Sequence, residues 1–478
     1  NIGDLMSLII PANSAAAATG FNVDNSARFD DGSSAYLDHT HNAVTSTRKN
    51  TFSVWVKRSH LTSYMYIIST RNGTDTNRDG IAFSGSDQID IRYNAGSSSP
   101  IRLTTNRLFR DVSAWLHIVV AVDTTQGTAA NRIKLYVNGV QETSFATANY
   151  MDQNYDFALN AKTDQTTDIG NDTRSDGSYF DGYMAEFVAL DGSQNAPTDF
   201  GEFDEDSGIW KPIDVSGLTF GSAGFYMNFQ TAAELGTDVS GNSNTFAENN
   251  LTAIDQSTDT CTNNSATIGT LFMGLNTPTF SEGNLQSYSS AAGLSPIPSS
   301  IGLSSGKWYV ELKYAATTSN DNTGIGITMD PASGNQANSD QGGYVFGYSA
   351  PDGNLFPYQG NPSGSFASYT VGDIMGIYMD LDNMKLYFSK NGSLQSTTGK
   401  TINVSNTGFY YFCVLDYTGT SNFWTWQWNF GAGCPFAISS GNTDANGYGN
   451  FEYSPTITGD GASKDFFACN TKNLSEYG

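Results

Sequence analysis

The sequence predicts an all-β protein with two β-sandwich domains in tandem and little helix. One strand-and-turn pattern occurs twice, about 250 residues apart, in segments 115–139 and 372–392. Each copy has a strand with period-two alternation and then a second strand that ends in Asn-Gly. Because Asn-Gly supplies the positive φ angles of a tight hairpin turn, each copy is predicted to be a β-hairpin. Two hairpins of one design indicate two sandwiches.

The composition agrees with this fold class. Charged residues make up only 15% of the chain and aromatic residues 13%, and there are 49 glycines. This profile is typical of a turn-rich all-β protein. A chain of 478 residues is too long for one core, and its length predicts about two to four domains.

The net charge excludes two classes of partner. The formal charge is −24, from 47 acidic and 23 basic residues. Such a surface repels nucleic acid phosphates and anionic membrane surfaces. In addition, no segment approaches the roughly 18–20 consecutive apolar residues of a membrane span. The sequence therefore predicts no nucleic acid binding and no membrane insertion.

The first domain is predicted over residues 21–229, after an N-terminal arm at residues 1–20. Strand signals begin in segments 21–39 and 52–59 and recur about every 8–12 residues, as in a sandwich. Pro197 favours the first position of a short helix. The segment Phe225–Gln230 is expected to be the closing strand.

The start of the chain leaves its origin open. The apolar run Leu5–Ile10 is too short for a secretory signal and lacks a basic flank, so a docked arm is expected. The chain does not begin with Met. It is therefore either a processed chain or part of a longer polypeptide.

A polar passage separates the two predicted domains. Residues 230–262 are rich in Gly, Asn and Ser, which indicates a linker. Within it, segment 247–255 is expected to pair onto the second sandwich. The second domain then covers residues 263–478, with Phe466–Leu474 as its last strand.

Several segments carry a resemblance to known families. Residues 21–229 resemble a laminin-G-like, concanavalin-A-like jelly roll in the stretches FSVWVKRS, WLHIVVAVD, KLYVNG and FDGYMAEFVALDG. Residues 263–478 resemble a SPRY domain in the stretches SSGKWYVELKY, GIGIT, GDIMGIYMDLDNMKLYFSKNG and WQWNFG. The two domains in this order, with segment 197–217 between them, are similar to tail-fibre and adhesin proteins of phages that infect marine bacteria.

This resemblance implies a function and a location. It implies a phage receptor-binding adhesin on the tail or capsid surface of the virion, acting outside the host cell. Its partners would be a host cell-surface glycan or protein and other virion proteins, and its assembly a homo-oligomer, commonly a trimer. The alternatives are a capsid-decorating or other structural virion protein, and a secreted glycan hydrolase.

The sequence does not predict an enzyme. Concanavalin-A-like glycoside hydrolases carry carboxylates at alternate positions of one strand, and Glu202, Asp204 and Asp206 alternate in this way. However, Ser207 stands where the hydrolase pattern requires Glu. The segment also lies between two prolines, which indicates connecting structure. No nucleophile elbow, phosphate-binding loop or HExxH motif occurs.

Calcium is the only cofactor that the resemblance suggests. Laminin-G-like jelly rolls often hold calcium at the rim, and carboxylates supply the oxygens it prefers. The candidate ligands are the aspartates that precede the FDGYMAEFVALDG stretch: Asp164, Asp168, Asp172, Asp176 and Asp181. Because Asp is also an ordinary turn residue and the spacing matches no calcium loop, solvated turns are the alternative interpretation.

Aromatic side chains in the second domain suggest a contact surface. Trp424, Trp426 and Trp428 alternate on one face of a strand, which predicts a core face. Trp424 lies nearest a loop and is the one expected to be exposed. The candidate ligand-binding residues lie in or beside Gly-, Pro- and Asn-rich turns: Tyr344, Tyr348, Tyr358, Tyr417 and Trp424. Packing of these loops onto the domain is the alternative.

The cysteines and histidines indicate no zinc site. The four cysteines contain no CxxC pair, and the four histidines are scattered. Free thiols are expected, as in a protein that folds in a reducing cytoplasm. Cys261 and Cys469 bracket the second domain, and whether they pair is left open.

Overall fold

Strands with period-two alternation form almost all of the regular structure. The computed structural model describes residues 20–478 except 72–77, 95–99, 173–176, 272–277, 290–295, 319–322, 330, 332–344, 351, 357–365, 403–407, 417–422 and 459–462. In the described part, regular helix is confined to three short 3-10 turns and one α-helix. The predicted all-β fold with two sandwiches is confirmed. The expected N-terminal arm lies almost wholly outside the described residues.

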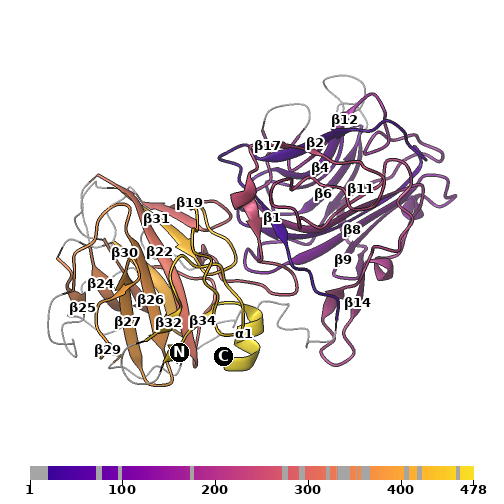
Figure 1. Ribbon diagram of the computed structural model, residues 1–478. Coiled ribbons are helices and arrows are strands. Elements are labelled where there is room, and N and C mark those ends of the chain that lie inside the picture. Colours follow the sequence, from indigo (N-terminus) through magenta and orange to yellow (C-terminus); the bar gives the residue numbers. More distant parts are fainter. Residues whose placement is uncertain are drawn as a thin grey trace. The chain divides into compact units, whose positions relative to one another are not determined.

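The described residues divide into two compact units, one ending at Asn264 and the other covering Ser265–Gly478. The first unit is a sandwich of two eight-stranded sheets (Figure 1). Its sheet A runs in the order β10 (Val140–Glu142), β9 (Ile133–Val137), β8 (Leu116–Asp123), β3 (Lys49–Arg58), β13 (Gly182–Asp191), β1 (Ser26–Phe29) and β18 (Gln256–Ser257), with β16 (Phe225–Met227) also on β13.

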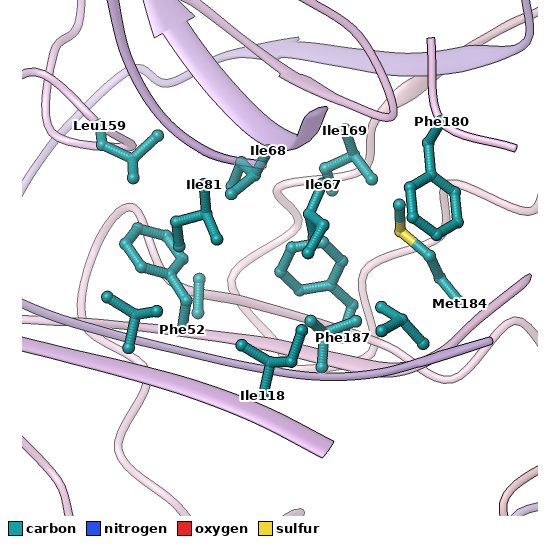
Figure 2. Close-up of a cluster of buried hydrophobic side chains, with 14 of the residues drawn as sticks. Phe52, Ile67, Ile68, Ile81, Ile118, Leu159, Ile169, Phe180, Met184 and Phe187 are labelled. Carbon is teal, nitrogen blue, oxygen red and sulfur yellow. The ribbon is translucent and has the colours of Figure 1, made fainter. Parts of the chain in front are cut away.

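Sheet B of the first unit packs against sheet A. It runs in the order β11 (Phe145–Asn149), β7 (Ile101–Thr105), β6 (Ile89–Tyr93), β5 (Arg78–Phe83), β4 (Met65–Arg71), β12 (Thr166–Ile169), β2 (Tyr36–Thr40) and β17 (Ala247–Asn249). Side chains from both sheets fill the space between them, as Figure 2 shows for Phe52 and Phe187 of sheet A and Ile68 and Ile81 of sheet B.

Short elements connect these strands. They are η1 (Ala129–Asn131), η2 (Pro197–Asp199), η3 (Ala253–Asp255) and the hairpin of β14 (Gly201–Phe203) and β15 (Trp210–Pro212). Pro197 occupies the first turn of η2, as predicted. The predicted closing strand is β16, which pairs with the middle of β13.

The predicted linker is wrong, because residues 230–262 belong to the first sandwich. β17 pairs with β2, and β18 pairs with β1, so segment 247–255 does not join the second sandwich. The buried ammonium of Lys57 donates to Asp259 at 2.7 Å and to Asn264 at 2.8 Å. Trp115 Nε1 also donates to Asp259. These polar contacts hold the end of the segment inside the first unit.

The second unit is also a two-sheet sandwich. Its larger sheet runs in the order β19 (Thr279–Ser281), β20 (Gln286–Ser289), β31 (Trp424–Asn429), β22 (Lys307–Thr317), β26 (Ile374–Asp380), β27 (Lys385–Lys390) and β28 (Ser393–Leu394), with β29 (Lys400–Thr401) on β27 and β34 (Phe467–Ala468) on β22. The other sheet contains β21 (Pro296–Pro298), β30 (Tyr411–Asp416), β23 (Thr323–Thr328), β24 (Val345–Ser349) and β25 (Leu355–Phe356).

The C-terminal segment differs from the prediction. A small hairpin of β32 (Thr456–Ile457) and β33 (Lys464–Asp465) precedes β34, which pairs in parallel with β22. The expected strand Phe466–Leu474 ends there, and α1 (Thr471–Tyr477) follows. Asn470 caps this helix by accepting a hydrogen bond from the Asn473 N–H at 2.9 Å. A helix cap therefore replaces the second half of the expected strand.

The two predicted hairpins are present. Asn138 and Gly139 have φ angles of 48° and 77° and connect β9 to β10. Asn391 and Gly392 have φ angles of 46° and 76° and connect β27 to β28. Both pairs have the positive angles of a primed turn.

The described residues contain no helix that is long and apolar enough to cross a membrane. All four cysteines are free and buried: Cys261 in the first unit, and Cys413, Cys434 and Cys469 in the second.

Candidate ligand-binding site

A polar cavity of about 360 Å³ lies on the first sandwich. We call it the Glu186 pocket. Its wall comes from the segment before β1, from β13 and β16, and from the loops that follow β15 and β16. The lining residues are Phe21, Asn22, Asp24, Asn25, Glu186, Asp214, Ser216, Tyr226, Asn228, Gln230 and Val239. A pocket of about 300–1,000 Å³ suits a small ligand, so this volume fits a terminal sugar or a molecule of similar size.

A β-bulge places Glu186 in this pocket. Met184 and Phe187 both belong to the core between the sheets, whereas strict alternation would send only one of them inward. The pairing of β13 with β3 shifts register between Ala185 and Val188. Glu186 has a φ of 48°, in the left-handed region that is uncommon for a residue with a side chain. The extra residue turns its carboxylate away from the apolar core.

Burial and one hydrogen bond set the chemistry of Glu186. Its exposed fraction is 7%, and Oε2 accepts a 2.5 Å hydrogen bond from the Tyr226 hydroxyl. Oε1 has no hydrogen-bond partner among the described residues. Burial, together with the nearby Asp214 and Asp24 carboxylates, raises the pKa of Glu186 to about 7, although the hydrogen bond from Tyr226 acts in the opposite direction. The pocket therefore contains a carboxyl group that changes its charge near neutral pH.

The pocket contains further groups that suit a hydroxylated ligand. Asp24 and Asp214 are exposed, and Asn228 and Gln230 add amide groups. Phe21 is half-buried and offers an aromatic face. Carboxylates accept hydrogen bonds, and amides both donate and accept them. This combination of a few convergent polar groups and an aromatic side chain is typical of small-molecule sites.

A second buried carboxylate, Glu311, differs from Glu186 in its hydrogen-bond partners. Glu311 in β22 accepts hydrogen bonds from the Tyr309 hydroxyl, the Asn429 amide and the two N–H groups of residues 452–453. Both of its oxygens therefore have partners within the protein. Glu186, in contrast, keeps one oxygen without a described partner.

The predicted calcium ligands that the structure describes form no group of three close enough together to hold one ion. Asp164 is exposed, Asp168 accepts from the Asn171 amide at 3.1 Å, and Asp172 pairs with Arg78 at 3.2 Å. The Arg78 cation takes the place that a metal ion would need beside Asp172. Asp176 lies outside the described residues.

Asp181 instead faces Asp31 and His60 at the ends of neighbouring strands. One ligand atom from each of these three residues lies within 4.8 Å of the other two. Among the described residues, no other group of three metal-ligating side chains lies so close together. Burial, together with the Asp31 carboxylate, raises the pKa of Asp181. Ser59 donates to Asp181, and Asp31 hydrogen-bonds His60 at 3.2 Å. An imidazole with two carboxylates suits a transition metal better than calcium, which prefers oxygen ligands.

The predicted exposure of the second-domain aromatics is wrong where the structure describes them. Tyr348 is 0% exposed and Trp424 is 3% exposed. The Tyr348 hydroxyl donates to the Ala367 carbonyl, and its ring packs edge-on against Phe366 and Phe388. These side chains form core, because the segment after β25 folds back over β24. The other three candidates, Tyr344, Tyr358 and Tyr417, lie outside the described residues.

The alternating acidic segment lies in connecting structure, as the sequence indicated. Glu202 is an exposed residue of β14 and pairs with Lys211 at 3.4 Å. Asp204 also binds Lys211, at 3.0 Å, and accepts from the Ser207 N–H and hydroxyl. Asp206 is exposed in the same hairpin. These groups stabilise a turn and line no described cavity.

The sequence analysis missed Glu186, although one signal was present. Glu186 is the single charged side chain between Gly182 and Leu190, a run of otherwise apolar residues that forms a fully buried strand. A charged residue in such a strand is seldom buried without a purpose.

Two family models match separate parts of the chain. The model described as the concanavalin A-like lectin/glucanases superfamily matches residues 31–197, and the SPRY domain model matches residues 307–425. Among curated proteins, the Ran-binding proteins 9/10 homolog of Drosophila melanogaster is 34% identical over 98 residues. These residues are 20% of this chain and 10% of that protein, so the match spans a tenth of the relative's length.

Solved structures resemble parts of the chain at low identity. The SPRY domain of human HERC1 is 18% identical, with a TM-score of 0.27, covering 32% of this chain and 91% of that chain. A putative carbohydrate binding protein from Bacteroides ovatus ATCC 8483 is 15% identical, with a TM-score of 0.31, covering 48% and 59%. The two family models match within the two units of the structure, one on either side of Asn264.

Proposed function

Because the chain carries a concanavalin A-like lectin/glucanase domain followed by a SPRY domain, we propose that it binds a glycan in the Glu186 pocket of its first sandwich. The observation that carries this proposal is the pocket itself. It is polar, it contains a buried carboxylate with one oxygen free of described partners, and it lies within the lectin-like unit.

Sugar hydroxyls need both donors and acceptors at fixed positions. Glu186 and the two exposed aspartates supply acceptors, whereas Asn228 and Gln230 supply both kinds of group. The Tyr226 hydroxyl holds Glu186 in place, so little side-chain freedom is lost when a ligand binds. The strained backbone at the bulge supports a functional role, because such strain concentrates at binding sites.

The test compares the glycan affinity of the unchanged protein with that of Asp24→Ala and Gln230→Ala. Both residues are exposed and line the pocket, so these variants should keep their melting temperature. We expect affinity to fall by about tenfold for each, since a hydrogen bond to a charged or polar group is lost. Asp206→Ala is the matched control, because Asp206 is an exposed aspartate outside the pocket. Equal affinity in all variants would show that the sugar binds elsewhere.

Glycan hydrolysis is the second candidate, and one observation favours it. A carboxyl group with a pKa of about 7 suits a general acid, and two further carboxylates line the same pocket. Under this alternative the protein would release reducing ends from its bound glycan, and Glu186→Gln would abolish the release. We expect binding without release, in which case the hydrolase alternative fails.

We further propose that the chain is an adhesin on a virion surface, acting outside the host cell. The order of the two domains supports this proposal through the resemblance described above. Several copies on one particle would convert weak single sites into firm attachment. Antibodies against the chain should then label intact virus particles in electron micrographs. Labelling of host envelopes without any particle labelling would contradict a virion location.

A further inference from the structure

The charged side chains that line the Glu186 pocket in the described part of the chain are all acidic. Three carboxyl groups line it, those of Asp24, Glu186 and Asp214, and its described lining contains no Lys, Arg or His. The carboxylates of Asp214 and Asp24 act on Glu186 strongly enough to oppose its ionisation. Among the described residues, the Tyr226 hydroxyl and the buried Cys261 thiol also interact with Glu186, and neither provides a positive charge. The pocket therefore has a negative potential that no residue of its described lining cancels.

We propose that the Glu186 pocket selects amino sugars that carry a protonated amine over neutral and anionic sugars. This inference rests on the proposed glycan-binding function and adds the chemical class of the ligand. An ammonium group would donate hydrogen bonds to the carboxyl groups and be attracted by the charges of Asp24 and Asp214, and also by that of Glu186 where it is ionised. A uronate or sulfated sugar would be repelled by the same charges and would bring a carboxylate or sulfate into the pocket without a cationic partner.

An organic cation fits this arrangement better than a metal ion does. In the part of the chain that the structure describes, only Asp31, His60 and Asp181 bring three metal-ligating atoms within 4.8 Å of one another. The three pocket carboxylates are thus spread around the cavity instead of meeting at one point. A sugar ring is large enough to reach several of them at once, whereas one metal ion is not.

The buried and exposed carboxylates contribute differently. Glu186 lies at 7% exposure with Oε1 free of described partners, so a ligand group replaces the hydrogen bond that water would otherwise give it. Asp24 and Asp214 are exposed, so their attraction is screened by salt. Selection by charge should therefore weaken as the salt concentration rises.

The test uses three oligosaccharide probes with the full chain at about pH 6, where a free sugar amine is largely protonated. The probes are glucosamine oligomers, N-acetylglucosamine oligomers of the same length, which have the same ring without the charge, and galacturonate oligomers. In titration calorimetry at low salt, we expect the glucosamine oligomers to bind about tenfold more tightly than the N-acetylated ones. We expect no measurable binding of galacturonate.

Charge-removing variants separate charge from shape. Asp24→Asn combined with Asp214→Asn keeps the size of both side chains and one acceptor oxygen on each, so the affinity for glucosamine oligomers should fall more than that for the neutral oligomers and the preference for the amine should drop to about twofold. Asp206→Asn is the control with the same change outside the pocket, and it should leave the preference intact.

The outcomes distinguish the failure of charge selection from the failure of glycan binding itself. If glucosamine and N-acetylglucosamine oligomers bind equally, or if galacturonate binds best, selection by charge is overturned and glycan binding stands. If only neutral glycans bind on a glycan array and glucosamine oligomers do not, selection by charge is again overturned and glycan binding stands. If no glycan binds on the array or in solution, both the selection and the glycan-binding function are wrong.

Discussion

Glu186 keeps its position through its backbone and one neighbour. The φ of 48° directs the side chain out of the core, and the Tyr226 hydroxyl donates to Oε2. Burial then makes the ionised form costly, because the carboxylate has lost water on most of its surface. The site thus lowers the stability of the folded protein at neutral pH, as binding sites commonly do.

Replacing Glu186 by Gln should therefore change how stability depends on pH. The folded-state pKa of about 7 lies above the ordinary value of 4.5, so the folded state binds more protons than the unfolded state between these values. Stability from this group is present below about pH 4.5 and is lost as pH rises through 7, a loss of about 3 kcal/mol. Glu186→Gln should match the unchanged protein at about pH 4.5 and exceed it at pH 8.

Urea unfolding across this pH range measures the difference between the two proteins. Taking the difference cancels the contribution of Glu311, whose pKa is also about 7. Glu202→Gln serves as a control, because Glu202 is exposed and its replacement should leave the pH profile unchanged. A Glu186→Gln profile parallel to that of the unchanged protein would contradict the buried, proton-binding role of Glu186.

At the scale of elements, the turns and the bulge position the functional surfaces. The turn between β9 and β10 places Gly139 against the ring of Trp210, whose Nε1 donates to His117 at 2.9 Å. The hairpin of β14 and β15 is thereby attached to sheet A. The loop after β15 supplies Asp214 to the Glu186 pocket. A turn that appears remote from the pocket thus helps to hold its wall.

Gly139→Ala should destabilise the first unit. A Cβ at Gly139 would lie 2.3 Å from the Trp210 ring, and its φ of 77° disfavours a side chain. The left-handed conformation alone costs about 1–2 kcal/mol, and displacement of Trp210 adds to this. Gly127→Ala is the control, because a Cβ there meets nothing within 4 Å and should be close to neutral. Thermal unfolding of both variants tests this, and equal melting temperatures would contradict it.

At the scale of the whole molecule, each unit has a core of its own. The core between sheets A and B is formed entirely by residues before Asn264, and a separate core lies within Ser265–Gly478. The predicted linker contributes Phe246 and Leu251 to the first core. The first domain therefore extends about 35 residues beyond its expected end at residue 229.

Two truncated chains test this boundary. Residues 20–264 should fold alone with a cooperative thermal transition, whereas residues 20–229 should not. The shorter chain lacks Asp259 and Asn264, which leaves the Lys57 ammonium buried without these partners at a cost of about 3–5 kcal/mol. It also exposes the sheet edges that β17 and β18 cover. Thermal unfolding of both chains, followed by circular dichroism, tests this boundary. A cooperative transition in the 20–229 fragment would support the interpretation of residues 230–262 as a linker.

The features that could be predicted from sequence are those with local causes. Period-two alternation and the Asn-Gly pairs act over a few residues, so the two hairpins, the sandwich class and the start of η2 at Pro197 followed from short segments. The two families came from the resemblance of longer stretches, such as FSVWVKRS and GDIMGIYMDLDNMKLYFSKNG, and the family models match the same regions. Composition was sufficient to predict that helix would be scarce.

The features that could not be predicted depend on residues far apart in the chain. Tyr348 looked exposed because its neighbours are turn formers, but residues 366–369 cover its ring. Asp172 was predicted as a calcium ligand, but in the folded protein it pairs with Arg78, which is distant in the sequence. Lys57 meets Asp259 across 202 positions of sequence, and the Glu186 pocket gathers residues from 21 to 239. Local pattern determines which strands form, but burial and charge at a site depend on which distant side chains the packed sheets bring together.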